Sequence, residues 1–144
     1  MRNWFEKLPH MKRKVTELHF YLHDIVAGPN PTNIPTAIDD LLTTGPSPNS
    51  TIVGRAKGLF GSTSLDDIGF HMTFNIVFTN GKYNGSTLSL IGHNPFLNEF
   101  RELPIVGGSG VFRLARGLAL LSNLVLNNTS GDAVVEYNVV VLHY

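Results

Sequence analysis

Apolar and polar residues alternate one by one over several stretches of the chain. The clearest is 70–78, where every second residue is large and apolar, namely Phe70, Met72, Phe74, Ile76 and Phe78. The stretch 16–26 follows the same rule and places Leu18, Phe20, Leu22 and Asp24 on one face, with His19, Tyr21 and His23 on the other. A period of two is typical of β-strands with one buried face. We therefore expect a strand in each stretch.

The same pattern, bounded by turn residues, predicts further strands at 50–61, 83–92 and 133–144. A turn is expected at 80–82, and the three prolines of 27–37 predict a loop. The stretch 112–126 is the one that could be read as a helix, but its arginines and Gly117 make it a poor one. Regular strands separated by turns predict an all-β barrel or sandwich.

Residues 1–14 differ from the rest, with scattered charge and the single tryptophan, Trp4. We expect a flexible N-terminal arm here rather than a binding patch. The remaining chain, 15–144, is long enough for one domain with a real core.

Charge and composition exclude several classes of protein. Lys and Arg total 11, as do Asp and Glu, so the formal net charge is zero, which argues against a nucleic-acid partner. No run approaches 18 apolar residues, so we expect no membrane span, and no leader-like stretch is seen at the N-terminus. The absence of cysteine excludes disulfides and thiolate chemistry.

Four Asn-x-Ser/Thr sequons favour a secreted protein. They are candidate glycosylation sites at Asn49, Asn84, Asn127 and Asn128. Asn84 also lies in an Asn-Gly turn, which has its own backbone reason to occur.

The segment 101–117, RELPIVGGSGVFRLARG, admits a phosphate cradle or a tight turn between strands. A phosphate loop needs a following helix whose amides point at the anion, and a strand-like run follows here, so we favour the turn. Metal binding is not expected, because His19 and His23 are well separated along a strand. No nucleophile elbow is present either.

Carboxylates on apolar stretches are the remaining chemistry. If the face of Asp24 points inward, burial raises its pKa and makes it a candidate general acid or base; the alternative is a cap at a strand end. An arginine such as Arg101, converging with an aspartate in an aromatic cavity, would suit a phenolic ligand.

These segments resemble the plant dirigent proteins. The resemblance rests on LHFYLHDI (18–25), VGRAKGLF (53–60), FNIVFTNGKYNGSTLSLIG (74–92), RELPIVGGSGVFRLARGLA (101–119) and GDAVVEYNVVVLHY (131–144). It implies an eight-stranded antiparallel β-barrel of the dirigent and allene oxide cyclase type. It also implies a secreted, N-glycosylated homotrimer of the extracellular space (apoplast) that needs no cofactor and has a pocket at one barrel mouth.

Site residues carry over by the same resemblance. Asp24 matches the aspartate of the first strand, Arg101 the pocket arginine, and Asp40 lies in a segment similar to the family's DDPLT. We expect the substrate to contact the side chains Phe20, Phe60, His93, Asn94 and Phe112.

Two departures separate the chain from the lignan-forming branch. Gly92-His93-Asn94-Pro95 stands where that branch has an aspartate, and Phe60 and Ser62 stand where it has tyrosines. Both are similar to the branch of pterocarpan-forming and gossypol-type dirigents.

Three functions remain open. The first is a dirigent that directs stereoselective coupling of phenoxy radicals made by a separate laccase or peroxidase, with gossypol-type coupling as a variant. The second is a pterocarpan synthase-like dehydratase and cyclase acting on isoflavanols through a quinone methide. The third is a non-catalytic cell-wall scaffold for lignin.

The chain also looks short between Ala37 and Ile38 relative to the family. Either a strand has been lost, which would leave an open barrel edge, or a segment is missing from the chain as written. We expect the second.

Overall fold

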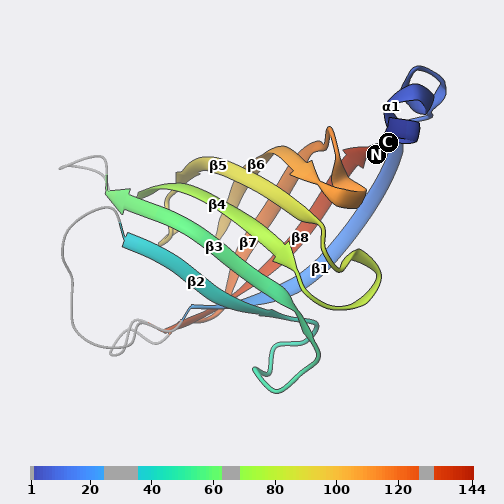
Figure 1. Ribbon diagram of the computed structural model, residues 1–144. Helices are drawn as coiled ribbons and strands as arrows, with labels where there is room; N and C mark the ends of the chain where they lie inside the picture. The colour runs from blue at the N-terminus through green and yellow to red at the C-terminus, as the bar shows by residue number, and fades with distance from the viewer. Residues whose placement is uncertain (1, 25–35, 63–68, 127–131) are drawn as a thin grey trace.

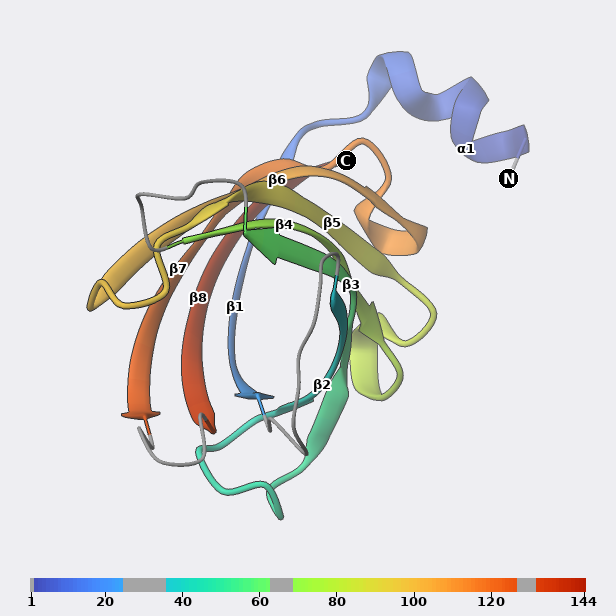
Figure 2. The same ribbon diagram turned by 90° about the vertical axis from the view of Figure 1, so that its left-hand side faces the viewer.

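The structure is a computed structural model that describes residues 2–24, 36–62, 69–126 and 132–144. Its strands are β1 (Lys14–Asp24), β2 (Thr36–Thr43), β3 (Ile52–Ser62), β4 (Phe70–Phe78), β5 (Thr87–Asn94), β6 (Phe100–Ser109), β7 (Arg116–Leu126) and β8 (Ala133–His143). Each strand pairs antiparallel with the next, and β8 pairs with β1 to close the barrel (Figures 1 and 2). The eight-stranded antiparallel β-barrel is thereby confirmed.

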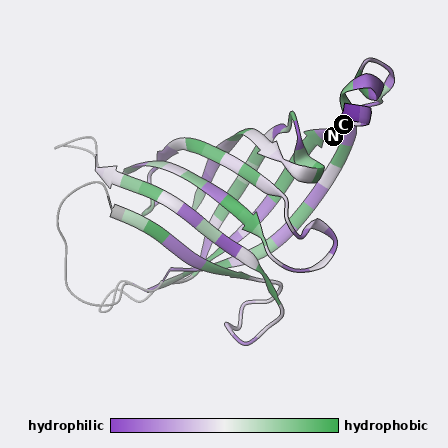
Figure 3. Cartoon of the chain, in the orientation of Figure 1, coloured by the Kyte–Doolittle hydropathy of each residue, from purple (hydrophilic) through white to green (hydrophobic). Residues whose placement is uncertain are grey.

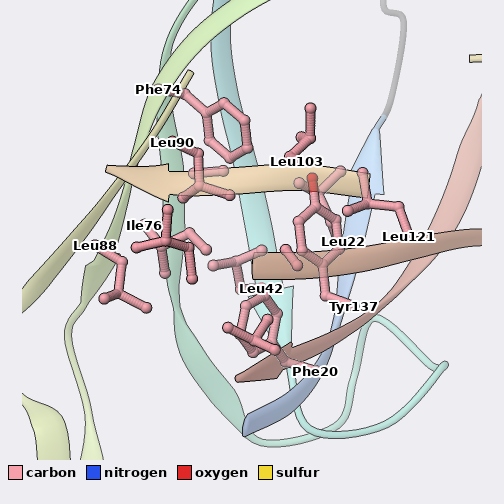
Figure 4. Packing of buried hydrophobic residues seen from close by; sticks show 14 of the residues in the cluster. Phe20, Leu22, Leu42, Phe74, Ile76, Leu88, Leu90, Leu103, Leu121 and Tyr137 are labelled. Atoms are coloured by element: carbon pink, nitrogen blue, oxygen red, sulfur yellow. The ribbon is translucent and has the colours of Figure 1, made fainter. Parts of the chain in front are cut away.

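Alternating hydropathy places one face of each strand inside the barrel (Figure 3). The interior is filled by apolar side chains from all eight strands, including Phe20, Leu22, Leu42, Phe74, Ile76, Leu88, Leu90, Leu103, Leu121 and Tyr137 (Figure 4). The apolar faces expected for 16–26 and 70–78 are buried at Phe20, Leu22, Phe74, Ile76 and Phe78. At the end of β1 the pattern differs, because His23 of the opposite face is also buried, with its Nε2 2.8 Å from the Thr43 Oγ1, and Asp24 is exposed.

The N-terminal residues lie outside the barrel. They form α1 (Arg2–Lys7) and the 3₁₀ turn η1 (Leu8–His10), neither of which buries a residue (Figure 1). The Trp4 ring lies 5.3 Å from the Arg113 guanidinium carbon. Over the described residues, we find no helix with the length and apolar character that a membrane crossing requires.

The glycine-rich segment is a turn between strands, as expected. β6 runs through Gly107 and Gly108 to Ser109, and the 3₁₀ turn η3 (Gly110–Phe112) leads toward β7. Gly110 has φ +67°, and a Cβ there would lie 2.5 Å from the Ser86 Oγ, so glycine is required. Most of the stretch 112–126 is strand β7, as its poor helix character suggested.

The structure shows no interruption between Ala37 and Ile38, so the alternative of a lost strand is wrong, whereas the expectation of a segment missing from the chain as written stays a prediction. Both residues lie inside β2, opposite Leu59 and Gly58 of β3, and the ladder continues through them. With the barrel closed, no strand is lost. The prolines at 29, 31 and 35 led us to extend the loop to residue 37, whereas β2 begins at Thr36, directly after the last of them.

Candidate functional site

One end of the barrel carries polar side chains on its inner wall. We call this the mouth end; there β1, β3, β5 and β7 finish, and β2, β4, β6 and β8 begin. Its inward polar residues, which we call the mouth cluster, are Asp24, Asp40, Asn94, Arg101, Asn123 and Tyr137.

Strand periodicity turns these side chains inward. In β2, Asp40 lies between the buried residues Ile38 and Leu42. In β6, Arg101 has the same parity as the buried residues Leu103 and Ile105.

Arg101 is a buried cation held by neutral acceptors. Its side chain is 6% exposed. Its Nε donates to Asn94 Oδ1 (3.0 Å), and its Nη1 donates to Asn123 Oδ1 (3.0 Å) and the Asn98 carbonyl oxygen (3.2 Å). Among the described residues, no carboxylate forms an ion pair with it. Burial lowers its pKa, yet an arginine side chain stays protonated in proteins.

The two inward carboxyls titrate abnormally. Burial, reinforced by the Asp24 carboxylate, raises the pKa of Asp40 to about 7, although Arg55 opposes the shift. Asp24 is more exposed, at the end of β1; partial desolvation and the Asp132 carboxylate raise its pKa as well. Near neutral pH, Asp40 therefore exists both as a proton donor and as a carboxylate, as acid–base catalysis requires.

This raised pKa predicts a pH-dependent stability for Asp40→Asn. Below about pH 4 the Asp40 carboxyl is protonated in both states; between about 4 and 7 only the unfolded chain loses the proton, so stability of the native protein falls. The cost is then constant above pH 7. Allowing for solvent screening, we expect Asp40→Asn to raise the free energy of unfolding by about 1–2 kcal/mol at pH 8 and to change it little at pH 4.

Asp39→Asn is the matched control for this urea-unfolding series. Asp39 lies on the outer face of β2, where Arg55 Nε donates to its carboxylate (2.6 Å) and lowers its pKa. Its replacement should therefore weaken stability at pH 8. Equal curves for wild type and Asp40→Asn from pH 4 to 8 would contradict the raised pKa.

Tyr137 was missed by the sequence reasoning. Its ring is 2% exposed and stacks on Phe20, with centroids 5.4 Å apart and planes 17° apart. Burial raises its pKa; Arg101 opposes this rise, and Asp40 and Asp24 add to it, so the hydroxyl stays protonated. Val135, Val139 and Val141 are apolar and lie an even number of residues from Tyr137. This alternation along the strand could have placed Tyr137 inside the barrel.

Aromatic rings border the mouth cluster. Phe60 contacts Phe70 edge to face with centroids 4.9 Å apart, and Phe70 stacks on Phe96 at 4.5 Å. All three are half-buried. Phe60 lies near the mouth end of β3, and Phe20 stacks on Tyr137 of the mouth cluster; that the substrate contacts them stays a prediction.

Other candidate residues lie elsewhere. His93 is exposed on the outer wall, opposite His71 of β4, because it follows the inward Gly92 and precedes the inward Asn94. Phe112 is buried at the other end of the barrel, against Phe78, Tyr83 and His143.

The sequons divide into two groups. Asn49 and Asn84 are exposed in turns outside the barrel ladders, whereas Asn127 and Asn128 lie outside the described residues. Glycosylation stays a prediction.

Within the described part of the chain, no three His, Asp or Glu side chains gather as a metal site would require.

A groove of about 260 Å³ lies along the seam between β1 and β3; it includes no residue of the mouth cluster but is bordered by Phe20, which stacks on Tyr137 of that cluster. Its walls include Leu18, Phe20, Val53, Phe78 and Tyr83. The seam arises because β2 pairs with β1 only from Tyr21 to His23. Neither Arg101 nor an inward carboxyl lines this groove.

Comparison with known proteins identifies the family of this barrel. The family model described as Dirigent-like protein matches residues 15–142. Dirigent protein 21 of Arabidopsis thaliana is 47% identical, over 93% of this chain and 80% of its own length. Pterocarpan synthase 1 of Glycyrrhiza echinata is 41% identical, over 92% of this chain and 80% of its own length.

Two solved structures agree with these relatives. The pterocarpan synthase dirigent protein GePTS1 superimposes with a TM-score of 0.84 at 42% identity, covering 92% of this chain and 89% of the other. PsPTS1 gives 0.82 at 41% identity, covering 91% and 96%. Matches in both sequence and structure over almost the whole barrel show that the chain belongs to the dirigent family.

Proposed function

We propose that the protein is a stereoselective dehydratase and cyclase that acts on a phenolic alcohol, of the isoflavanol class, through a quinone methide. The observation that carries this proposal is Asp40, an inward carboxyl whose pKa is raised to about 7, in the same cluster as the buried cation Arg101. Pure templating of radicals needs no such acid. The relatives named pterocarpan synthase support the same class of reaction.

The reaction needs two protons moved and no oxidant. Asp40 donates its proton to the benzylic hydroxyl, which leaves as water, while the Asp24 carboxylate accepts the proton of the conjugated phenol. Arg101 stabilises the negative charge on that phenol oxygen, and a quinone methide forms. A second phenol oxygen of the molecule then adds to the benzylic carbon. Its proton returns to Asp40, and the first phenol oxygen recovers its proton from Asp24, so the net change is loss of one water.

A second candidate is the dirigent function in the narrow sense, which directs coupling of phenoxy radicals supplied by a laccase or peroxidase. The half-buried rings Phe60, Phe70 and Phe96 favour it, because their stacked surface suits a flat phenolic radical. Coupling of this kind needs shape and stacking but no titrating acid.

The test is incubation of the purified protein with a racemic isoflavanol in the absence of any oxidase, followed by chiral chromatography. The proposal expects one enantiomer to disappear faster and a single cyclised enantiomer to accumulate. No turnover would exclude the cyclase. Oxidase-driven coupling, with hemigossypol before coniferyl alcohol, would then test the second candidate. Racemic product in that assay would leave the non-catalytic cell-wall scaffold as the remaining candidate function.

We also propose that the protein assembles as a homotrimer through its outer wall. Ile91 of β5, Val106 of β6, Leu120 of β7 and Val140 of β8 are exposed apolar residues on four successive strands. Exposed apolar side chains on successive strands of one wall are typical of an interface.

Light scattering tests the assembly. We expect about three times the 15.8 kDa chain mass for the wild type and the chain mass for Leu120→Glu. Leu59→Glu, at an exposed apolar position on β3, is the control and should keep the trimer. A monomeric wild type would contradict this proposal.

Dirigent family proteins are generally extracellular. Together with the exposed sequons Asn49 and Asn84, this supports secretion to the apoplast as part of the proposal.

A further inference from the structure

Arg101 lacks an anionic partner in the part of the barrel that the structure describes. Its hydrogen bonds go to two amide oxygens and one carbonyl oxygen, all of them neutral. Dipoles of this kind orient a guanidinium but only partly offset the cost of burying its charge. The inner wall of the mouth end is therefore suited to an anion brought by the ligand.

Tyr137 offers a second donor beside this cation. Arg101 and Tyr137 both lie opposite Leu121, one on each side of it, so their backbones are two strand spacings apart, about 10 Å. Both side chains point into the barrel and are long enough for their ends to approach one atom between them. The electrostatic coupling of the Tyr137 hydroxyl to Arg101, Asp40 and Asp24 agrees with this placement.

The Tyr137 hydroxyl is available for a hydrogen bond. The ring is fixed by stacking on Phe20, and Figure 4 shows its oxygen pointing away from Phe20. Among the described residues, none forms a hydrogen bond with this oxygen. One described side-chain atom is both fully enclosed and without a partner, and it belongs to His143 rather than to Tyr137. The half-buried Asp40 and the exposed Asp24 form the solvent side of the cluster.

We infer that the Tyr137 hydroxyl, together with the Arg101 guanidinium, forms an oxyanion site that binds the phenol of the ligand as a phenolate. The inference rests on the proposed function, because this phenol is taken to be the one that loses its proton when the quinone methide forms. Tyr137 is then a catalytic residue that donates to the substrate oxygen, and it strengthens its hydrogen bond as charge develops there. The proton lost by the phenol goes to the Asp24 carboxylate, and no oxidant is involved.

The probe is 4-nitrophenol, whose absorbance distinguishes phenol from phenolate. It is titrated with protein in a buffer about one pH unit below its own pKa, so that the free probe is mostly neutral. We expect the bound probe to show the phenolate band. Tyr137→Phe, which keeps the ring and its stacking on Phe20, should weaken phenolate binding about 10- to 100-fold, because a hydrogen bond to a charged group is lost.

Two controls separate this role from a structural one. 4-Nitroanisole has the same ring but cannot ionise, so its affinity should change less than about 3-fold in Tyr137→Phe. Tyr21→Phe removes a hydroxyl that donates to Glu136 on the outer wall (3.2 Å), and it should bind the phenolate as the wild type does. Thermal unfolding checks that both variants are folded.

The outcomes are separable from those of the cyclase test. Phenolate binding that depends on Tyr137 supports the oxyanion site even if no isoflavanol is turned over. The inference is wrong if the bound probe stays neutral or does not bind. It is equally wrong if Tyr137→Phe binds phenolate normally, or if the variant loses 4-nitroanisole to the same extent.

Discussion

Asp40→Asn is expected to lower the rate of isoflavanol cyclisation about 10²- to 10⁴-fold, the range typical of a lost general acid. The amide has nearly the same shape and can still form hydrogen bonds, but it has no proton to give to a leaving hydroxyl near neutral pH. The loss should therefore appear in kcat, with KM changed little. Single-turnover assays of wild type and variant with the preferred enantiomer measure it.

Asp24→Asn tests the base of the same proposed reaction. Because Asp24 is the base that takes the phenol proton, its replacement should also slow the reaction, but the product enantiomer should be unchanged. Asp39→Asn, one residue from Asp40 on the outer wall, should leave turnover intact. An Asp40→Asn protein that keeps more than half of the wild-type kcat would remove Asp40 as the acid.

Arg101→Gln is expected to lower kcat/KM about 10²- to 10³-fold, as removal of a charged group that stabilises a developing oxyanion does. Glutamine keeps a donor that can reach neighbouring amides, so the change tests charge more than packing. The charge acts on an oxygen inside the barrel, where water screens it less than at the surface.

Arg55→Gln is the matched control for charge, because Arg55 is half-buried on the outer wall in an ion pair with Asp39. Thermal unfolding should show both glutamine variants folded at the assay temperature. If Arg101→Gln unfolds, Arg101→Lys is used instead. It keeps the charge without the planar fork, so it should retain activity even if its stability is lower. Wild-type kcat/KM in a folded Arg101→Gln would rule out the oxyanion role.

Much of the fold could be predicted from the sequence because strand periodicity is a local property. The inward faces of β1 and β4 follow from the alternation of Phe20 and Leu22, or of Phe74 and Ile76, with polar residues. The start of β2 could not be predicted in this way. Thr36 and Ala37 become strand because β3 offers them partners at Phe60 and Leu59, a non-local contact that the prolines before them concealed.

The site was predicted in its residues more than in its chemistry. Parity alone could have separated His93 from Asn94, since neighbours on a strand face opposite walls. The raised pKa of Asp40 was beyond reach of the sequence, because it depends first on burial inside the barrel and then on Asp24 from the adjoining strand. Phe112 carried no local warning either, since η3 buries it at the far end of the barrel.

The central claim is that the Asp40 carboxyl acts as the acid that releases water from the substrate. It is tested most directly by kcat/KM for the preferred isoflavanol enantiomer as a function of pH, without oxidase. Because the active form is protonated, kcat/KM should fall about tenfold per pH unit above pH 7, where Asp40 ionises, and it should also fall on the acid side as Asp24 takes up a proton. A kcat/KM that stays constant or rises from pH 6 to 9 would contradict the account.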